Sequence, residues 1–255
     1  MRNFELYGDY YDLFNSDKDY ASEINYIMLG LYKHLGERSF NILELGSGSG
    51  GHAQFLSANE NVISILGIER SPAMVEIANN KNIPKFNSQV GDISKLHEID
   101  TGLKYNVALS LFHVVCYLET NDNLLSCFRG VVNKLEQGGL FIFDVWYSPA
   151  VYYQRPETRV RRKENEELKA TRIAESRVFS DLNVVDVNFE IIITDKKTKN
   201  LIAFNETHRM RHFSTPEINL LASTTGFKVV DAHEFLTCNA PSENTWGVTY
   251  ILKKI

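Results

Sequence analysis

Apolar residues in the first 150 positions follow helical spacing in some segments and form short continuous runs in others. Residues 19–35 carry one apolar face at helical spacing, made by Tyr20, Ile24, Ile27, Met28 and Leu31. Short apolar runs predict five buried strands, at 40–45, 62–68, 85–90, 105–111 and 140–145. Helical segments at 52–58, from 71 onward and at 121–135 lie between most of them. This alternation predicts parallel βαβ units and a doubly wound α/β sheet.

The pattern changes after residue 150. Three long segments, 167–179, 184–194 and 201–213, alternate polar and apolar residues and predict an antiparallel meander. The α/β pattern then resumes, with a helix at 215–225 and strands at 227–234 and 246–253. We expect one α/β domain, formed by 1–150 with 214–255. The inserted sheet, 151–213, is expected to cover the substrate or to form a dimer interface through its edges.

The composition fits a globular protein, and the net charge argues against two classes of partner. The chain has 255 residues, 44% of them hydrophobic, and its 27 basic against 32 acidic residues give a net charge of −5. A mildly acidic chain has no general attraction for nucleic acids or anionic membranes. The amino terminus lacks a long apolar core, and no stretch approaches the ~20 apolar residues of a membrane span. We therefore expect a cytoplasmic protein that binds neither nucleic acid nor membrane.

A glycine-rich segment between the first strand and the next helix predicts a cofactor site. Residues 44–51 read Glu-Leu-Gly-Ser-Gly-Ser-Gly-Gly, and glycine there lets the backbone approach a ligand closely. The segment matches both the dinucleotide pattern G-x-G-x-x-G and the methyltransferase pattern E/D-x-G-x-G-x-G. Glu69, at the end of the second strand, suits a ribose in either case. These two features leave the choice open.

Two further features favour a methyltransferase. Gly91-Asp92-Ile93 follows the third strand, where an acid would accept the adenine amino group and its apolar neighbour would pack on the ring. Gly138-Gly139, expected as the turn that ends the helix before the fifth strand, points the same way. In this order and spacing, the features resemble those of class I S-adenosylmethionine-dependent methyltransferases. A nucleotide-dependent oxidoreductase and a non-catalytic cofactor-binding module remain as alternatives.

The resemblance implies a Rossmann-like sheet of seven strands with the last antiparallel, here with the meander inserted after the fifth. It implies S-adenosylmethionine as methyl donor and S-adenosylhomocysteine as product. The residues that it assigns to the donor are Tyr20, Glu44, Gly46, Ser47, Gly48, Glu69, Arg70, Met74, Gly91, Asp92, Ile93 and Ser110.

Three segments resemble a narrower family, the N-methyltransferases of nucleotide-linked 3-amino-deoxysugars. They are residues 10–21, with Y-D-L-F and K-D-Y-A, residues 110–118, and Glu206-Thr-His-Arg209. The chain departs from that family at His113, where the family has serine, and at residues 144–147, Asp-Val-Trp-Tyr instead of E-P-W-W. The implied acceptor is the amine of a nucleotide-linked amino sugar. The alternative is O- or N-methylation of another small precursor of cell-surface polysaccharide.

Methyl transfer needs an aligned and deprotonated acceptor more than it needs many catalytic groups. The resemblance places Tyr11 and Tyr117 at the acceptor, and His113 is the histidine expected to face the methyl donor, so these three are the catalytic candidates. The residues expected to bind substrate are Trp146, Tyr147, His208 and Arg209.

The remaining charged and sulfur-containing residues give weaker predictions. The basic run at 155–163 is either a clamp for a diphosphate or a solvated face. The three cysteines are odd in number and lie at no metal-like spacing, so they are expected to be reduced packing residues. Without a ligand-spaced acidic or histidine cluster, we predict activity without a metal.

Overall fold

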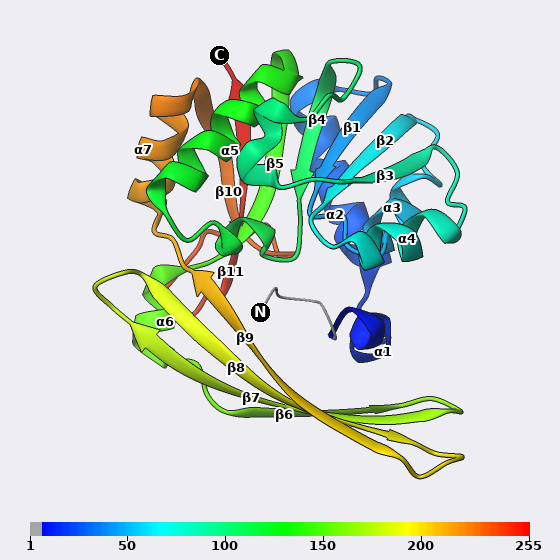
Figure 1. Ribbon diagram of the computed structural model, residues 1–255. Coiled ribbons are helices and arrows are strands. Elements are labelled where there is room, and N and C mark those ends of the chain that lie inside the picture. The colour runs from blue at the N-terminus through cyan, green and yellow to red at the C-terminus, as the bar shows by residue number, and fades with distance from the viewer. Residues whose placement is uncertain (1–6) are drawn as a thin grey trace.

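The computed structural model describes residues 7–255, which form two separate β-sheets (Figure 1). Residues 1–6, part of the amino-terminal stretch that we expect to carry no long apolar core, lie outside the described residues. The larger sheet has the order β10-β11-β5-β4-β1-β2-β3. Its strands are β1 (Phe40–Leu45), β2 (Val62–Glu69), β3 (Phe86–Val90), β4 (Tyr105–Ser110), β5 (Leu135–Trp146), β10 (Phe227–Glu234) and β11 (Gly247–Lys254).

Strand directions confirm the predicted fold class. Strands β3, β2, β1, β4 and β5 are parallel, and β11 runs antiparallel to both β5 and β10. Because side chains alternate across a strand, Leu43 and Phe141 enter one apolar cluster, while Ile42 and Leu140 enter another. The sheet is therefore covered on both faces, as a doubly wound sheet requires.

Helices cover the two faces of the main sheet. The first cluster includes residues of α5 (Asn121–Lys134) and α7 (Thr215–Thr225), and the second includes residues of α2 (Tyr20–Leu35) and α3 (Gly51–Leu56). Helix α4 (Pro72–Asn80) packs beside β3, with Ser71 as its N-cap. The sequence pattern did not indicate four short helices in the described residues: η1 (Tyr7–Tyr10), α1 (Tyr11–Phe14), η2 (Ile93–Glu98) and η3 (Val114–Tyr117).

The predicted turn at Gly138-Gly139 is wrong. Helix α5 ends at Lys134 and the chain enters β5 directly at Leu135, so both glycines lie within the strand. The pairing of β4 with β5 shifts register between Tyr105 and Val107. Gly138 has a φ of +76°. The glycines therefore accommodate an irregularity in the strand, a common use of glycine in sheets.

The second sheet contains the predicted meander and one more strand. Its order is β6 (Arg159–Glu164), β7 (Leu168–Phe179), β8 (Val184–Asp195) and β9 (Leu201–Arg211), all antiparallel. The strand β6 is most of the basic run that we expected as a clamp or a solvated face. Charged side chains are tolerated there because β6 is an edge strand.

A short junction, which we call the root of the insertion, connects the inserted sheet to the main sheet. The chain leaves β5 through α6 (Ser148–Gln154) and returns from β9 to α7. The backbone of Phe213 donates to the Trp146 carbonyl oxygen at 2.9 Å, and that of Ser148 donates to the Phe213 carbonyl oxygen at 2.8 Å. Figure 1 shows the sheet curving away below the main sheet, with α1 between the two. In residues 7–255 we find no helix of sufficient length and apolarity to span a membrane.

Candidate active site

A cavity of about 740 Å³ lies between the carboxyl ends of the parallel strands and the inserted sheet. This is the edge at which doubly wound sheets bind ligands. Fifteen predicted site residues line it: Tyr11, Tyr20, Gly46, Ser47, Gly48, Glu69, Arg70, Met74, Gly91, Asp92, Ile93, His113, Tyr117, Trp146 and His208. The four predicted residues that do not line it are Glu44, Ser110, Tyr147 and Arg209.

The glycine-rich loop after β1 needs glycine for two different reasons. Gly46 has a φ of +72°, and a Cβ there would lie 2.5 Å from the side chain of Val114. Gly48 also has a positive φ, but a Cβ there would meet no protein atom within 4 Å. Gly48 is thus open toward the cavity, and its backbone N–H donates to Glu69 at 3.1 Å.

Two carboxylates hold defined positions on the same side of the cavity. Glu69 ends β2 and accepts a hydrogen bond from the backbone N–H of Ser71 at 2.8 Å. Asp92 follows β3 and accepts from the backbone N–H of Ser94 at 2.9 Å. Since both acids are oriented by backbone donors at adjacent strand ends, this side of the cavity suits the ribose and the base of a nucleoside.

Glu44 and Ser110 lie behind this wall and do not line it. Ser110 is fully buried and donates to the Leu45 carbonyl oxygen at 3.3 Å. Glu44 is 1% exposed and lies with its Oε1 3.7 Å from Nδ1 of His52. Burial, reinforced by the nearby charge of Glu69, raises the pKa of Glu44 to about 8.

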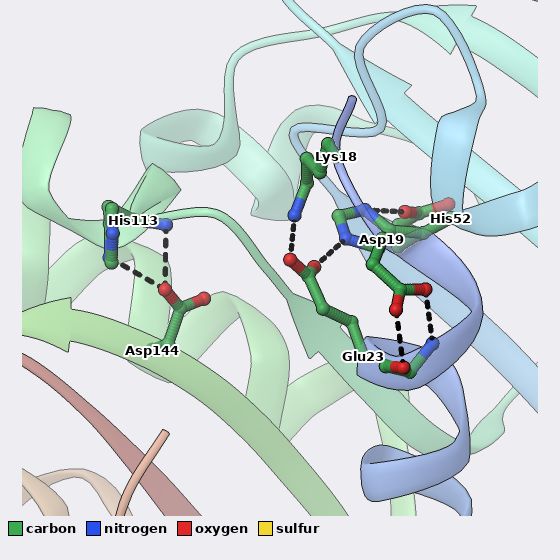
Figure 2. Close-up of polar contacts among 8 residues, drawn as sticks. Lys18, Asp19, Glu23, His52, His113 and Asp144 are labelled. Carbon is green, nitrogen blue, oxygen red and sulfur yellow. Dashed lines mark hydrogen bonds and ion pairs between the residues drawn. The ribbon is translucent and has the colours of Figure 1, made fainter. Parts of the chain in front are cut away.

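A buried ionic cluster under the loop escaped the sequence analysis. Glu23 of α2 forms an ion pair with Lys18 and lies 2.8 Å from Nε2 of His52, which lines the cavity (Figure 2). Burial raises the pKa of Glu23, but hydrogen bonds from His52 and Lys18 outweigh burial and leave it below its usual value. Glu23 lies on the buried face of α2 with Ile24 and Ile27. Because a buried charge needs an oppositely charged or hydrogen-bonding partner, an acid at such a position in the sequence indicates that one is nearby.

His113 occupies a strained turn at the end of β4. Phe112 and His113 both adopt left-handed backbone conformations, with φ of +67° and +62°. Such a conformation costs a residue other than glycine roughly 1–2 kcal/mol. His113 is held there by Asp144 of β5, whose Oδ2 lies 2.6 Å from Nδ1 of the imidazole and accepts the backbone N–H of His113 at 3.1 Å (Figure 2).

Asp144 is fully buried. Burial raises the pKa of its carboxyl group, but the attraction of His113 and the hydrogen bond from its imidazole outweigh burial and set the pKa below the usual value. The sequence analysis noted Asp144 as a departure from the family pattern and gave it no role. Its partnership with His113 depends on the pairing of β4 with β5, which a local pattern does not reveal.

The inserted sheet brings His208 to Tyr117. The Tyr117 hydroxyl lies 2.7 Å from Nδ1 of His208, and Nε2 of His208 lies 3.0 Å from Oε1 of Glu206. Burial raises the pKa of Tyr117 far above its usual value, so the phenol keeps its proton. Burial acts in the same direction on Tyr11. A protonated phenol can donate a hydrogen bond.

Arginines of the inserted sheet also reach the cavity. Arg172 of β7 donates to the Tyr7 hydroxyl at 2.6 Å and stacks 4.5 Å from the ring centre of Phe189. From the basic run, Arg159 and Arg161 line the cavity, and Arg161 also forms an ion pair with Asp17. Arg172 sits in an alternating strand with no local signature, so only the folded sheet reveals it.

Two predicted substrate contacts are placed elsewhere, and the prediction is corrected accordingly. Tyr147 packs against the core and its hydroxyl lies 3.3 Å from that of Thr215. Arg209 pairs with Asp186 through two contacts, at 2.7 and 2.9 Å. Arg209 follows His208 directly, and successive side chains of a strand point to opposite faces, so the two cannot share the cavity.

The amino-terminal helix closes the cavity from the side. Asp12 of α1 accepts from the Ser49 hydroxyl at 2.6 Å and from the Lys81 ammonium at 2.8 Å. These contacts fix α1 on the glycine-rich loop and on Lys81, the residue that follows α4, with Tyr11 in the cavity wall. Within residues 7–255, no three His, Cys, Asp or Glu side chains are grouped to hold a metal ion.

Comparisons with known proteins agree with this geometry. Residues 16–232 match the family described as Methyltransferase domain. The chain is 24% identical over 226 residues to dTDP-3-amino-3,4,6-trideoxy-alpha-D-glucopyranose N,N-dimethyltransferase of Streptomyces venezuelae, covering 88% of this chain and 90% of that enzyme. It is 28% identical over 145 residues to dTDP-4-amino-2,3,4,6-tetradeoxy-D-glucose N,N-dimethyltransferase of Saccharopolyspora spinosa, and that match covers 56% of this chain and about half, 55%, of the relative.

Solved structures share the fold over nearly the whole chain. DesVI of Streptomyces venezuelae superposes with a TM-score of 0.79 at 21% identity, covering 98% of each chain. The amino pentose methyltransferase CalS10 of Micromonospora echinaspora, solved with S-adenosylmethionine bound, gives 0.76 at 17% identity, covering 100% of this chain and 99% of that one.

The chain therefore belongs to the methyltransferase domain family, whose match spans most of its length. It is an enzyme, an S-adenosylmethionine-dependent methyltransferase. The sequence predicted this class from the glycine-rich loop and Glu69 together with Asp92 and Gly138-Gly139, although the two glycines lie within β5 and form no turn after α5.

Proposed function

We propose that this enzyme methylates the amino group of a nucleotide-linked amino sugar. The observation that carries the proposal is that one cavity brings the residues predicted for the donor together with His113. The glycine-rich loop, Glu69 and Asp92 line this cavity, and so does His113, whose partner is Asp144. The names of the two amino sugar N,N-dimethyltransferases to which the chain is similar support this acceptor.

S-Adenosylmethionine supplies an electrophilic methyl on a sulfonium. Glu69 would accept hydrogen bonds from the ribose hydroxyls, and Asp92 would accept one from the adenine amino group. Met74 and Ile93 would pack on the base. Gly46, Ser47 and Gly48 let the loop backbone approach the methionyl part, with Tyr20 and Arg70 beside it.

On the acceptor side, the ammonium of the sugar must lose one proton before it has a lone pair. His113 takes this proton, the freed nitrogen forms its bond to the methyl carbon, and the carbon–sulfur electrons remain on sulfur. Tyr11, Tyr117 and His208 orient the sugar by hydrogen bonds, and Trp146 supplies an aromatic wall for it. Arg159, Arg161 and Arg172 suit the diphosphate of the carrier.

The second candidate is methylation of a sugar hydroxyl in another precursor of cell-surface polysaccharide. One observation favours it: a histidine paired with a buried carboxylate is a suitable base for a hydroxyl, which must lose its proton as it attacks. The amine remains our first choice because both similar sugar methyltransferases are named for amines.

Competition between two acceptors tests the proposal. The purified enzyme is incubated with S-adenosylmethionine and equal amounts of a dTDP-linked 3-amino-deoxysugar and its 3-hydroxy counterpart, and the products are followed by mass spectrometry. We expect one and then two methyl groups on the amino sugar, with the hydroxy sugar unchanged. Methylation of the hydroxy sugar alone would replace the first candidate by the second.

We further propose a cytoplasmic homodimer. All three cysteines are free, as is typical of a reducing compartment. The exposed edge strands β6 and β9 offer backbone groups for pairing between subunits. Light scattering of the purified protein is expected to give twice the chain mass, and a monomer mass would remove the dimer.

A further inference from the structure

We propose that Asp144 is a positioning residue that makes His113 the proton acceptor. The inference deepens the proposed function and rests on it for the identity of the acceptor. Its basis is a geometry that no local sequence pattern carries. One buried carboxylate oxygen lies 2.6 Å from Nδ1 of His113 and also accepts the backbone N–H of the same residue.

This double contact fixes the imidazole in one orientation. The backbone hydrogen bond holds the left-handed turn at Phe112 and His113, and Nδ1 is buried 2.6 Å from the carboxylate. The ring also packs against Trp146, and a Cβ on Gly247 would lie 3.6 Å from its Cε1 atom. The His113 side chain nevertheless lines the cavity, so Nε2 is the ring nitrogen available to a substrate.

The charge of Asp144 then selects the tautomer. A carboxylate is an acceptor only, so its contact with Nδ1 requires a proton on that atom. In the neutral ring, Nε2 carries the lone pair and can take a proton from the acceptor. Without Asp144, the ring has no such bias, and the turn loses the acceptor for the backbone N–H of His113.

A second reading of the pair is structural, with Asp144 only stabilising the turn. Both readings require the imidazole proton on Nδ1, because both keep the contact with the carboxylate. They differ in what they predict for kcat. A structural role predicts losses of activity that follow stability, whereas a positioning role predicts a loss of kcat in variants that remain folded.

The first test is the tautomer of His113 in the unmodified enzyme, measured by long-range proton–nitrogen NMR of the imidazole rings. The chain has seven histidines, and the signal that disappears in His113→Gln identifies the ring. We expect neutral His113 with its proton on Nδ1. A proton on Nε2 would overturn the proposal. This measurement needs no acceptor, so failure of the pair and failure of the proposed acceptor are separate results.

The second test is kinetic. Asp144→Asn is expected to lower kcat about 10- to 100-fold, with KM for S-adenosylmethionine changed less than about threefold. His113→Gln should lower kcat by a similar factor. The double variant should have a kcat little lower than that of either single variant, because the two residues act as a unit.

The matched control is Asp231→Asn, which removes a carboxylate 3.1 Å from His34 outside the cavity and should leave kcat unchanged. A folded Asp144→Asn enzyme with the wild-type kcat would contradict the proposal.

Discussion

A substitution of Glu69 tests the proposed donor site at a single residue. Glu69 is the last residue of β2 and lines the cavity, where its carboxylate would accept hydrogen bonds from the ribose hydroxyls of the donor. Glu69→Gln removes the charge that strengthens these hydrogen bonds, so affinity for S-adenosylhomocysteine should fall about 10-fold or more. Calorimetric titration measures this change. Glu76→Gln, at an exposed position of α4, is the control, and equal affinities in both variants would exclude Glu69 from the donor site.

Glu44 gives a prediction about stability. Its folded-state pKa is raised by burial to about 8, against an ordinary value of 4.5. The unfolded chain therefore loses this proton first, and the stability present below pH 4.5 is lost progressively as pH rises toward 8. Glu44→Gln does not titrate, so its thermal midpoint relative to wild type should rise between pH 5 and pH 8.5. A difference that is the same at both pH values would contradict the assignment.

Most residues predicted to bind the donor line the cavity, and for three of them this placement was predictable because they follow strands directly. Gly46, Glu69 and Asp92 come at three successive strand ends, and such ends meet at one edge of a parallel sheet. The partners of His113 and His52 were not predictable, since Asp144 and Glu23 are distant in sequence and reach them only through packing. His113 was expected as the histidine that faces the donor, yet His52 and His208 also line the cavity.

At the scale of elements, the contact between η3 and β9 connects the catalytic sheet to the insertion. Tyr117→Phe removes the hydroxyl that lies 2.7 Å from His208. We expect kcat/KM for the acceptor to fall about 10-fold, with affinity for S-adenosylhomocysteine unchanged. Steady-state kinetics and calorimetry separate the two effects. The control, Tyr153→Phe on the exposed face of α6, should change neither kcat/KM nor this affinity. A loss of donor affinity in Tyr117→Phe would instead assign Tyr117 to the donor site.

Long elements with a clear period were predicted to within a few residues. The strands β1, β2 and β10 and the helix α7 agree closely with the hydrophobic pattern. The strand β6 was missed because Arg159–Glu164 carries charge at nearly every position, which hides the period of a strand. The predicted turn at Gly138-Gly139 failed because glycine signals a turn and a strand irregularity equally well.

At the scale of the whole molecule, the root of the insertion holds a buried histidine. His212 lies 2.8 Å from the Ser148 hydroxyl, and burial, aided by the charge of Arg211, lowers its pKa to about 4. Because the unfolded residue titrates near 6.5, stability present above pH 6.5 should be lost as pH falls toward 4.

A substitution at the root isolates this contribution. His212→Asn does not titrate in this range, so the stability difference between wild type and variant should shrink from pH 7 to pH 4.5. Denaturant unfolding at the two pH values measures the difference. A stability difference that is the same at both pH values would show that His212 does not cause the loss of stability in acid.

The central claim is that the cavity joins an S-adenosylmethionine site to an amine acceptor site. The most direct measurement uses S-adenosylmethionine labelled with carbon-13 in its methyl group and a dTDP-linked 3-amino-deoxysugar. After the reaction, NMR locates the labelled carbon in the product. The account predicts the label on the sugar nitrogen. Label on a sugar oxygen, or no transfer to the sugar by an enzyme that binds S-adenosylhomocysteine, would contradict it.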